Sequence, residues 1–251
     1  KFIEVGYQDY AKYRSDPSKE ASSQLSPYFH HGQISTHEVF EKISELESWS
    51  PESINPKMVG RREGWWGSSE NFESFMDELI TWRELGYHTC VRRANYNQYS
   101  SLPEWAIKTL HEHSSDEREH IYSLDELTYS QTHDEIWNAA QNQLRTQGVI
   151  QNYLRMLWGK KILEWTPNPQ IALSYMITLN DRYSLDGRDP NSYSGVFWIL
   201  GRYDRAWGPE RSIFGKIRYM TSDSTARKFN LKPYLEKWGN ESLGVSTSIS
   251  K

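Results

Sequence analysis

The segment Leu154–Trp165 reads Leu-Arg-Met-Leu-Trp-Gly-Lys-Lys-Ile-Leu-Glu-Trp, and the spacing of its apolar residues decides the fold class. Beginning at Ile150, apolar side chains return every three or four positions, which is the period of a helix that buries one face. The residues of this pattern are Ile150, Tyr153, Leu154, Leu157, Trp158, Ile162 and Trp165. The pattern lasts about four turns and predicts a long core helix.

The same period elsewhere predicts further helices. Phe72–Ile80 repeats it, and Ser35 followed by Glu38 is typical of a capping box that begins a helix. Helices are also expected over 36–47, from Pro103 to His111 and from Pro169 to about Tyr183. Alternating strand patterns between hairpin turns are not evident, so the sequence predicts an all-α fold.

The chain has 251 residues, enough for one large domain or two small ones. Loop-forming residues concentrate in 48–71 and 185–194, and the last residues are rich in Ser. The simplest division is one helical domain over 1–240, followed by a flexible tail over 241–251.

Composition argues against several classes of protein. The mean hydropathy is −0.80, and no stretch approaches the ~18 apolar residues of a membrane span. The N-terminal residues do not resemble a signal peptide. The single Cys90 excludes an internal disulfide, so we expect an intracellular protein, cytoplasmic if its source is bacterial.

Common catalytic and metal-binding motifs are missing from the sequence. Neither His30–His31 nor His111–His113 has the spacing of a zinc protease site, so we expect no bound metal. No nucleophile elbow, Walker A loop or Rossmann glycine motif occurs. The sequence therefore gives no support to ordinary hydrolases, kinases and dehydrogenases.

The last third of the chain is rich in basic residues, and the whole chain is rich in aromatic residues. Residues 155–238 hold 14 Lys and Arg against 8 Asp and Glu, although the whole chain has a net charge of −4. Such a basic third is typical of a surface that meets a polyanion, and equally of a solvated face. The 11 Trp and 16 Tyr suit either core packing or stacking on flat ligands.

Three tryptophans and a few polar residues are candidates for chemistry. Trp158 and Trp165 lie two turns apart on one helix face, and with Trp137 they suit electron transfer or, on spacing alone, core packing. Arg155 and Asp186 suit an interior ion pair beside a cofactor. The hydroxyls of Ser22, Ser23 and Ser26 suit either a phosphate or a helix cap.

Taken together, these stretches resemble the FAD-binding domain of the photolyase/cryptochrome family, and most closely its class II cyclobutane-pyrimidine-dimer photolyases. The matching stretches follow the family order between Tyr10 and Tyr234. They are Arg14–Pro17, Leu25–Ser35, Glu78–Leu85, Asp134–Gln141, Leu154–Trp165, Leu179–Asn180, Leu185–Asn191 and Gly215–Met220.

The resemblance implies a helical FAD-binding domain from which the family's N-terminal α/β antenna domain is absent. Positions that match FAD contacts are Tyr10, Ser22, Ser23, Leu25, Ser26, Trp137, Asn138, Gln141, Arg155, Asn180, Asp186 and Asp189. Asn180 matches the class II asparagine that faces flavin N5 and favours the reduced flavin. Trp165, Trp158 and Trp137, in that order, match the photoreduction chain.

The resemblance also implies light-driven DNA repair, in which reduced FAD gives an electron to a cyclobutane pyrimidine dimer. Trp105, Met156 and Trp198 match positions that line the lesion pocket, and Arg218 matches a basic residue that enters the duplex. The implied catalytic residues are Asn180, Trp137, Trp158, Trp165 and Met156. The implied partner is damaged DNA, and we expect a monomer without metal or membrane contact.

A few positions depart from the family pattern. Gln151 stands where many relatives have the His that 6-4 repair needs, so the resemblance argues against 6-4 repair. His31 replaces a usual Phe near the FAD turn, and the loop over 48–71 is longer than in typical members. Two alternatives stay open: a light-sensing flavoprotein without repair activity, and a flavoprotein of this fold that acts on another substrate.

Overall fold

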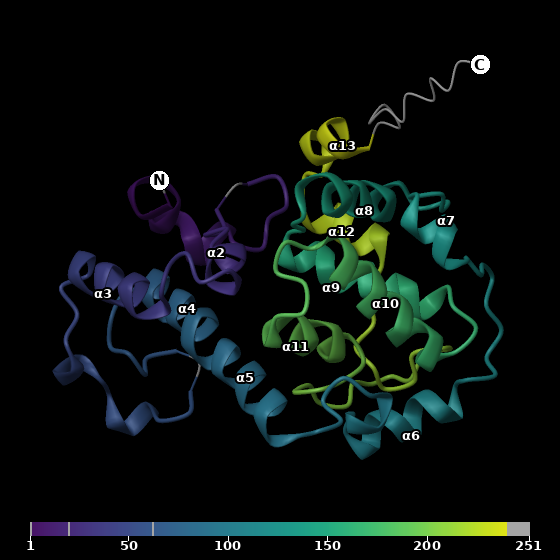
Figure 1. Ribbon diagram of the computed structural model, residues 1–251, viewed down its shortest axis with the longest axis horizontal. Coiled ribbons are helices and arrows are strands. Elements are labelled where there is room, and N and C mark those ends of the chain that lie inside the picture. Colours follow the sequence, from purple (N-terminus) through teal and green to yellow (C-terminus); the bar gives the residue numbers. More distant parts are fainter. Residues whose placement is uncertain (1, 20, 62, 240–251) are drawn as a thin grey trace.

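Helices joined by turns make up the computed structural model, which describes residues 2–19, 21–61 and 63–239. No strand occurs within these ranges, where an isolated bridge joins Arg211 to Gly215. The α-helices in Figure 1 are α1 (Tyr10–Tyr13), α2 (Ser26–His30), α3 (Thr36–Leu46), α4 (Glu70–Met76), α5 (Arg83–Arg92), α6 (Glu104–Glu112), α7 (Leu124–Thr128), α8 (Glu135–Gln147), α9 (Asn152–Glu164), α10 (Pro169–Tyr183), α11 (Pro190–Ile199), α12 (Ser222–Lys228) and α13 (Lys232–Trp238). The prediction of an all-α fold is confirmed.

The long core helix that the sequence predicted is α9. Gln151 caps its start, because the side-chain Oε1 accepts hydrogen bonds from the backbone N–H groups of Tyr153 and Leu154 at 2.7 and 3.1 Å. Apart from the half-buried Tyr153, the apolar residues of the predicted pattern are buried. Trp165 follows the last helical residue and ends the buried stripe.

Other expected helices form with small differences at their ends. The helix expected over 36–47 is α3, and the Ser35 hydroxyl accepts from the backbone N–H of Glu38 at 3.0 Å. Pro103 precedes α6, whereas Pro169 is the first residue of α10. The cap and proline signals therefore located these helices correctly.

The helix predicted over Phe72–Ile80 is part of a longer one that widens in its middle. α4 continues through η5 (Asp77–Trp82), a π-helix, into α5. The indole Nε1 of Trp82 donates to Asp77 Oδ2 at 2.9 Å and so spans the wide turn. One π turn shifts the apolar pattern by a single residue, so the sequence period did not reveal it.

The expected loop over 185–194 is wrong at its C-terminal end, because α11 begins at Pro190. Asp189 Oδ1 accepts from the backbone N–H of Asn191 at 2.9 Å and caps the helix. An Asp followed by a Pro is a helix-start signal, and the sequence contained it.

Two hydrophobic clusters stabilise the fold. The N-terminal cluster joins α3 and α4 through residues such as Ile43, Phe72 and Phe75, and the larger cluster is built on α8 to α11. In Figure 1 α3 and α4 lie on one side and α8 to α10 on the other, with α5 and α11 between them. α5 and α11 approach closely at Gly86, where an added Cβ would lie 2.9 Å from Asn191 Oδ1.

A second close approach, between α9 and α11, depends on Gly159. A Cβ there would lie 2.1 Å from Cδ1 of Ile199 and 3.0 Å from the sulfur of Met176. Lys160, which is almost fully buried, donates to the carbonyl of Ile199 at the end of α11. The crossing therefore positions the helix that carries the central site residues.

Gly159→Ala is expected to lower the free energy of unfolding by about 1–3 kcal/mol, because the added methyl group overpacks this crossing. The matched control is Gly195→Ala in α11, where an added Cβ meets nothing within 4 Å. The control is expected to change stability by at most about 1 kcal/mol, in the stabilising direction. Urea unfolding of both variants checks the prediction, and equal midpoints would contradict it.

None of the helices in the described ranges is long and apolar enough to cross a membrane. The predicted tail over 241–251 lies outside the described residues, and the domain division at residue 240 stays a prediction.

Candidate functional site

Three polar side chains predicted to contact a cofactor converge where α9, α10 and the turn after α10 meet. Arg155 Nη1 donates to Oδ1 of the buried Asn180 at 2.6 Å. Because that oxygen is occupied by Arg155, the Nδ2 amide group of Asn180 is left to donate to another partner. The structure thus brings Arg155 and Asn180 together from residues 25 positions apart.

Asp186 completes this polar cluster through electrostatics and hydroxyl hydrogen bonds. Burial raises the pKa of Asp186, but the Arg155 guanidinium and hydrogen bonds from Ser184 and Ser26 outweigh burial and hold that pKa below its ordinary value. The carboxylate is therefore charged at neutral pH. We call Arg155, Asn180, Asp186 and Ser26 the polar cluster.

Asp189 ties the start of α11 to α2 and α5. It is buried, its Oδ2 lies 3.3 Å from His30 Nδ1, and the hydroxyl of Tyr87 hydrogen-bonds to it. His31 Nε2 lies 3.2 Å from the carbonyl oxygen of Leu185 in the same turn. These contacts hold the segment 22–31 against the turn that carries Asp186.

The remaining N-terminal candidates have different surroundings. Ser22 is exposed, and the hydroxyl of Ser23 accepts from the backbone N–H of Leu25 at 3.4 Å, so both serines lie in the turn before α2. Tyr10 is buried in the N-terminal cluster, with ring contacts to Phe2 and Phe75. Among Ser22, Ser23 and Ser26, only Ser26 has a described hydrogen bond to Asp186.

The three predicted tryptophans form a connected, buried group. The rings of Trp137 and Trp165 meet edge to face with centroids 5.7 Å apart, and Trp137 Nε1 donates to the carbonyl oxygen of Trp158 at 3.0 Å. All three side chains are at most 2% exposed. Trp137 therefore contacts both of the other tryptophans, and the order of the three in an electron path stays a prediction.

Two further candidates on α8 serve contacts within the protein. Gln141 Oε1 accepts from Nε1 of Trp158 at 2.8 Å, so it fixes the indole. The amide of Asn138 exchanges hydrogen bonds with Thr132, including a 2.8 Å bond from Thr132 Oγ1. Both are consistent with scaffolding of the site, and their direct contact with a cofactor stays a prediction.

The lesion-pocket candidates do not all come together. The ring of Trp198 packs on that of Trp82 at a tilt of 38°, with centroids 4.3 Å apart, whereas Trp105 packs against Gly201 and the larger core. Met156 is half-buried beside Arg155 on α9. Trp82 was not among the predicted site residues, although it stands in the matched stretch Glu78–Leu85.

Arg218 lies on the exposed surface of the basic third of the chain. Its guanidinium is 5.0 Å from the ring centre of Trp207, and that of Arg205 is 4.5 Å from the same ring. Trp207 is anchored by its Nε1, which donates to Asp204 Oδ1 at 3.0 Å. The two guanidinium groups therefore share one aromatic ring and form a fixed cationic surface.

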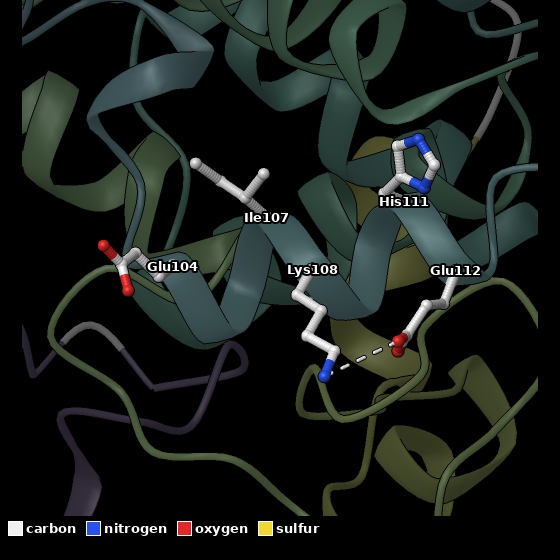
Figure 2. Close-up of a pocket in the computed structure, with 5 residues that line it drawn as sticks. All are labelled: Glu104, Ile107, Lys108, His111 and Glu112. Atoms are coloured by element: carbon white, nitrogen blue, oxygen red, sulfur yellow. Dashed lines mark ion pairs between the residues drawn. The ribbon is translucent and has the colours of Figure 1, made fainter.

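Two surface hollows lie away from the polar cluster. One, of about 350 Å³, is lined by Glu104, Ile107, Lys108, His111 and Glu112, and Figure 2 shows that all five come from α6. The dashed line there marks a 4.0 Å ion pair between Lys108 and Glu112. A second hollow, of about 400 Å³, is lined in part by Trp165. Within the described ranges, no group of three His, Cys, Asp or Glu side chains is arranged to hold a metal ion.

Comparison with known proteins identifies the family. The chain is 42% identical over 236 residues to a deoxyribodipyrimidine photo-lyase of Methanothermobacter thermautotrophicus, and 41% identical over 225 residues to one of Potorous tridactylus. A deoxyribodipyrimidine photo-lyase of Arabidopsis thaliana is 40% identical over 236 residues. The chain belongs to the photolyase family.

The similarity to photolyases covers nearly all of this chain but only part of its relatives. The alignments include 94%, 89% and 93% of the chain, and 48%, 39% and 44% of the three relatives in the same order. The chain thus spans about half the length, or less, of the curated photolyases it matches. No family model matches it.

A solved photolyase has the same fold. The crystal structure of a bacterial class III photolyase from Agrobacterium tumefaciens superposes with a TM-score of 0.65 over 94% of this chain and 42% of that chain, at 18% sequence identity. At this identity the likeness concerns the fold alone, and it agrees with the helical architecture described above.

The residues of the polar cluster fit a flavin. An arginine, an amide with a free N–H group and an ionised carboxylate match the alternating donors and acceptors on the polar edge of an isoalloxazine ring. The hydroxyl of Ser23, which accepts from the backbone N–H of Leu25 and keeps its own proton, supplies a donor that suits a phosphate oxygen. The polar cluster would therefore hold a flavin beside α9, α10 and the turn at Asp186.

Proposed function

We propose that this chain is the FAD-binding part of a DNA photolyase of the class II type, which splits cyclobutane pyrimidine dimers in damaged DNA by light-driven electron transfer. The observation that carries the proposal is that α9 holds both Arg155 of the polar cluster and, one turn later, Trp158 of the tryptophan group. Bound reduced FAD supplies an electron donor that light excites. The chain's own residues bind it, orient it and exclude water.

Each group of residues has a separate task in this proposal. Arg155 and Asp186 hold the flavin edge, and Asn180 offers its amide N–H to the ring, which favours the reduced form. Trp158, Trp137 and Trp165 conduct an electron inward during photoreduction. Trp82 and Trp198 supply flat apolar walls for a dinucleotide that has left the base stack.

The test is an absorption spectrum of the protein loaded with FAD, followed under blue light with a reductant and DNA that contains dimers. We expect the flavin bands to bleach while the dimers disappear. Flavin that bleaches while dimers persist would favour a light sensor or another substrate. Failure to retain FAD would contradict the proposal as a whole.

The basic surface gives a separate prediction about DNA affinity. Arg218→Ala is expected to weaken binding to a lesion duplex and to reduce the salt dependence of log K by about one unit, the value for one phosphate contact. The matched control is Arg145→Ala, because Arg145 also stacks on an aromatic ring, 5.1 Å from the centre of Tyr129, but lies on α8. Binding titrations at several salt concentrations check this, and equal slopes for Arg218→Ala and the unaltered protein would contradict it.

A further inference from the structure

The pair of tryptophans assigned to the wall of the lesion pocket is held in place by residues outside the pair. Trp82 and Trp198 pack on each other with ring centroids 4.3 Å apart, and both are half-buried, so each keeps part of its surface open to solvent. Aromatic surface that stays fixed and partly open is typical of a site that receives a flat ligand. The contacts that hold this pair therefore bear on how a ligand is recognised.

Tyr203 is a direct neighbour of Trp82. Their rings meet edge to face, with centroids 6.3 Å apart and an angle of 62°. The other contacts of this indole are its packing on Trp198 and the hydrogen bond from its Nε1 to Asp77 Oδ2 at 2.9 Å. Tyr203 is thus a third support of Trp82, from a segment far away in the sequence.

The ring of Tyr203 is tethered to α5 by its hydroxyl. The hydroxyl donates to the carbonyl oxygen of Leu85 at 3.3 Å and is also hydrogen-bonded to the hydroxyl of the buried Thr89. Since a phenol has one proton and Tyr203 gives it to Leu85, Thr89 is the donor in the second bond. Two hydrogen bonds to one helix therefore fix the end of the phenol ring.

The backbone at Tyr203 has an uncommon conformation. Its φ is 64°, in the left-handed region that bulky residues seldom adopt, and Gly201 has a φ of 106°. Between them, Arg202 is buried, with its guanidinium 3.8 Å from the ring centre of Phe197 and its Nη2 2.8 Å from the carbonyl oxygen of Tyr96. Such a backbone persists only where surrounding contacts impose it, and it is concentrated at ligand-binding sites.

The same turn reaches the remaining tryptophan of the lesion pocket. A Cβ added at Gly201 would lie 3.0 Å from Cη2 of Trp105, so the backbone of the turn passes directly beside that indole. The turn therefore contacts Trp105 through Gly201 and Trp82 through Tyr203. It joins candidates that do not pack on each other.

We propose, on the basis of the proposed function, that Tyr203 is a positioning residue for lesion recognition. Its tethered ring holds Trp82 on Trp198 in the free protein, so the aromatic wall is formed before a dinucleotide leaves the base stack. A preformed wall reduces the cost of ordering side chains on binding. This gain applies to an extruded lesion and not to an intact duplex, whose bases stay stacked. Tyr203 therefore raises the preference for damaged DNA.

The first measurement compares two duplexes. The full chain, loaded with FAD, is titrated in the dark with a duplex that contains one cyclobutane dimer and with the same duplex intact. Tyr203→Phe keeps the ring and loses both hydrogen bonds. We expect its affinity for the dimer duplex to fall about tenfold, the factor for one hydrogen bond of ordinary strength, with the affinity for the intact duplex retained. Tyr203→Gly removes the ring, suits the left-handed backbone and should lose more.

The second measurement reports the wall without DNA. Two indoles 4.3 Å apart couple their electronic transitions and give a couplet in far-ultraviolet circular dichroism, which Trp82→Phe identifies by its loss. We expect the couplet to weaken in Tyr203→Phe and to be lost in Tyr203→Gly. The matched control is Tyr234→Phe, because the hydroxyl of Tyr234 also donates a hydrogen bond, to Gln143 Oε1 at 2.7 Å, but lies on α13. This control should retain both the couplet and the two affinities.

Two outcomes would overturn the inference. One is a couplet or a ratio of the two affinities that stays unchanged in both Tyr203 variants. The other is an equal loss of affinity for both duplexes, which would indicate general damage to the DNA-binding surface. Failure of the proposed function has a different signature, because the unaltered protein would then bind both duplexes equally while the couplet still depended on Tyr203. Urea unfolding of each variant confirms that it is folded.

Discussion

Replacing Trp137 with Phe is expected to slow photoreduction by about 10²-fold or more, equivalent to about 3 kcal/mol of added barrier, while FAD stays bound. Trp137 is fully buried and contacts both of the other tryptophans, through its ring with Trp165 and through its Nε1 with the carbonyl of Trp158. Phe keeps an aromatic ring in this position but is much harder to oxidise. An electron that moves from Trp165 to the flavin would then have no intermediate carrier at position 137. Bleaching of the flavin bands under blue light with a reductant measures the effect.

A matched control separates this electron-transfer role from packing. Trp49 also donates its Nε1 to the carbonyl oxygen of a tryptophan, Trp66, at 2.7 Å, but it belongs to the N-terminal cluster. Trp49→Phe and Trp137→Phe each remove one indole hydrogen bond, at a cost of about 1 kcal/mol. Only Trp137→Phe should slow bleaching. If the flavin bands of Trp137→Phe bleach at the normal rate, Trp137 does not belong to the electron path.

Replacing Arg155 with Met is expected to weaken FAD binding by about 10²-fold, equivalent to about 3 kcal/mol, since a charged donor at the flavin edge is lost. The substitution also leaves the Asp186 carboxylate without its cationic neighbour and Asn180 Oδ1 without its donor. The FAD-free protein should therefore lose about 1–3 kcal/mol of unfolding free energy at neutral pH. FAD titration and urea unfolding measure the two effects, and Arg182→Met, an exposed arginine of α10, is the control.

The stability that Arg155→Met loses should depend on pH, because Arg155 attracts the charged form of Asp186. In the unaltered protein the pKa of Asp186 lies below its ordinary value of about 3.9. Asp186 therefore contributes stability above that pH, and the contribution is lost as pH falls through the lowered pKa. Without Arg155, the largest of the effects that lower this pKa is lost and the pKa rises, so Arg155→Met should lose less stability as the solution is acidified. Adding Asp186→Asn to Arg155→Met should restore stability at neutral pH. If Arg155→Met instead lost more stability as the pH falls, the interaction between Arg155 and Asp186 would be refuted.

The sequence by itself determined the secondary structure where short-range rules apply. The apolar period of 150–165, the cap at Ser35 and the prolines at 103 and 169 located four helices, because helix periodicity and end signals act within a few residues. The same local reasoning missed the π-helix Asp77–Trp82 and extended a loop into α11. The π turn shifts the pattern by only one residue, and the Asp-Pro start of α11 was outweighed by the glycine and asparagine around it.

The tertiary structure decided which candidates share a site. Arg155 and Asn180 meet because α9 and α10 pack side by side, and the hydrogen bond of Ser26 to Asp186 joins residues 160 positions apart in the chain. No sequence spacing encodes such contacts. The contacts of Trp137 with Trp158 and Trp165, and the packing of Trp82 on Trp198, likewise depend on how separate segments pack. Local chemistry fixed the helices, and long-range packing of their buried faces placed the functional groups.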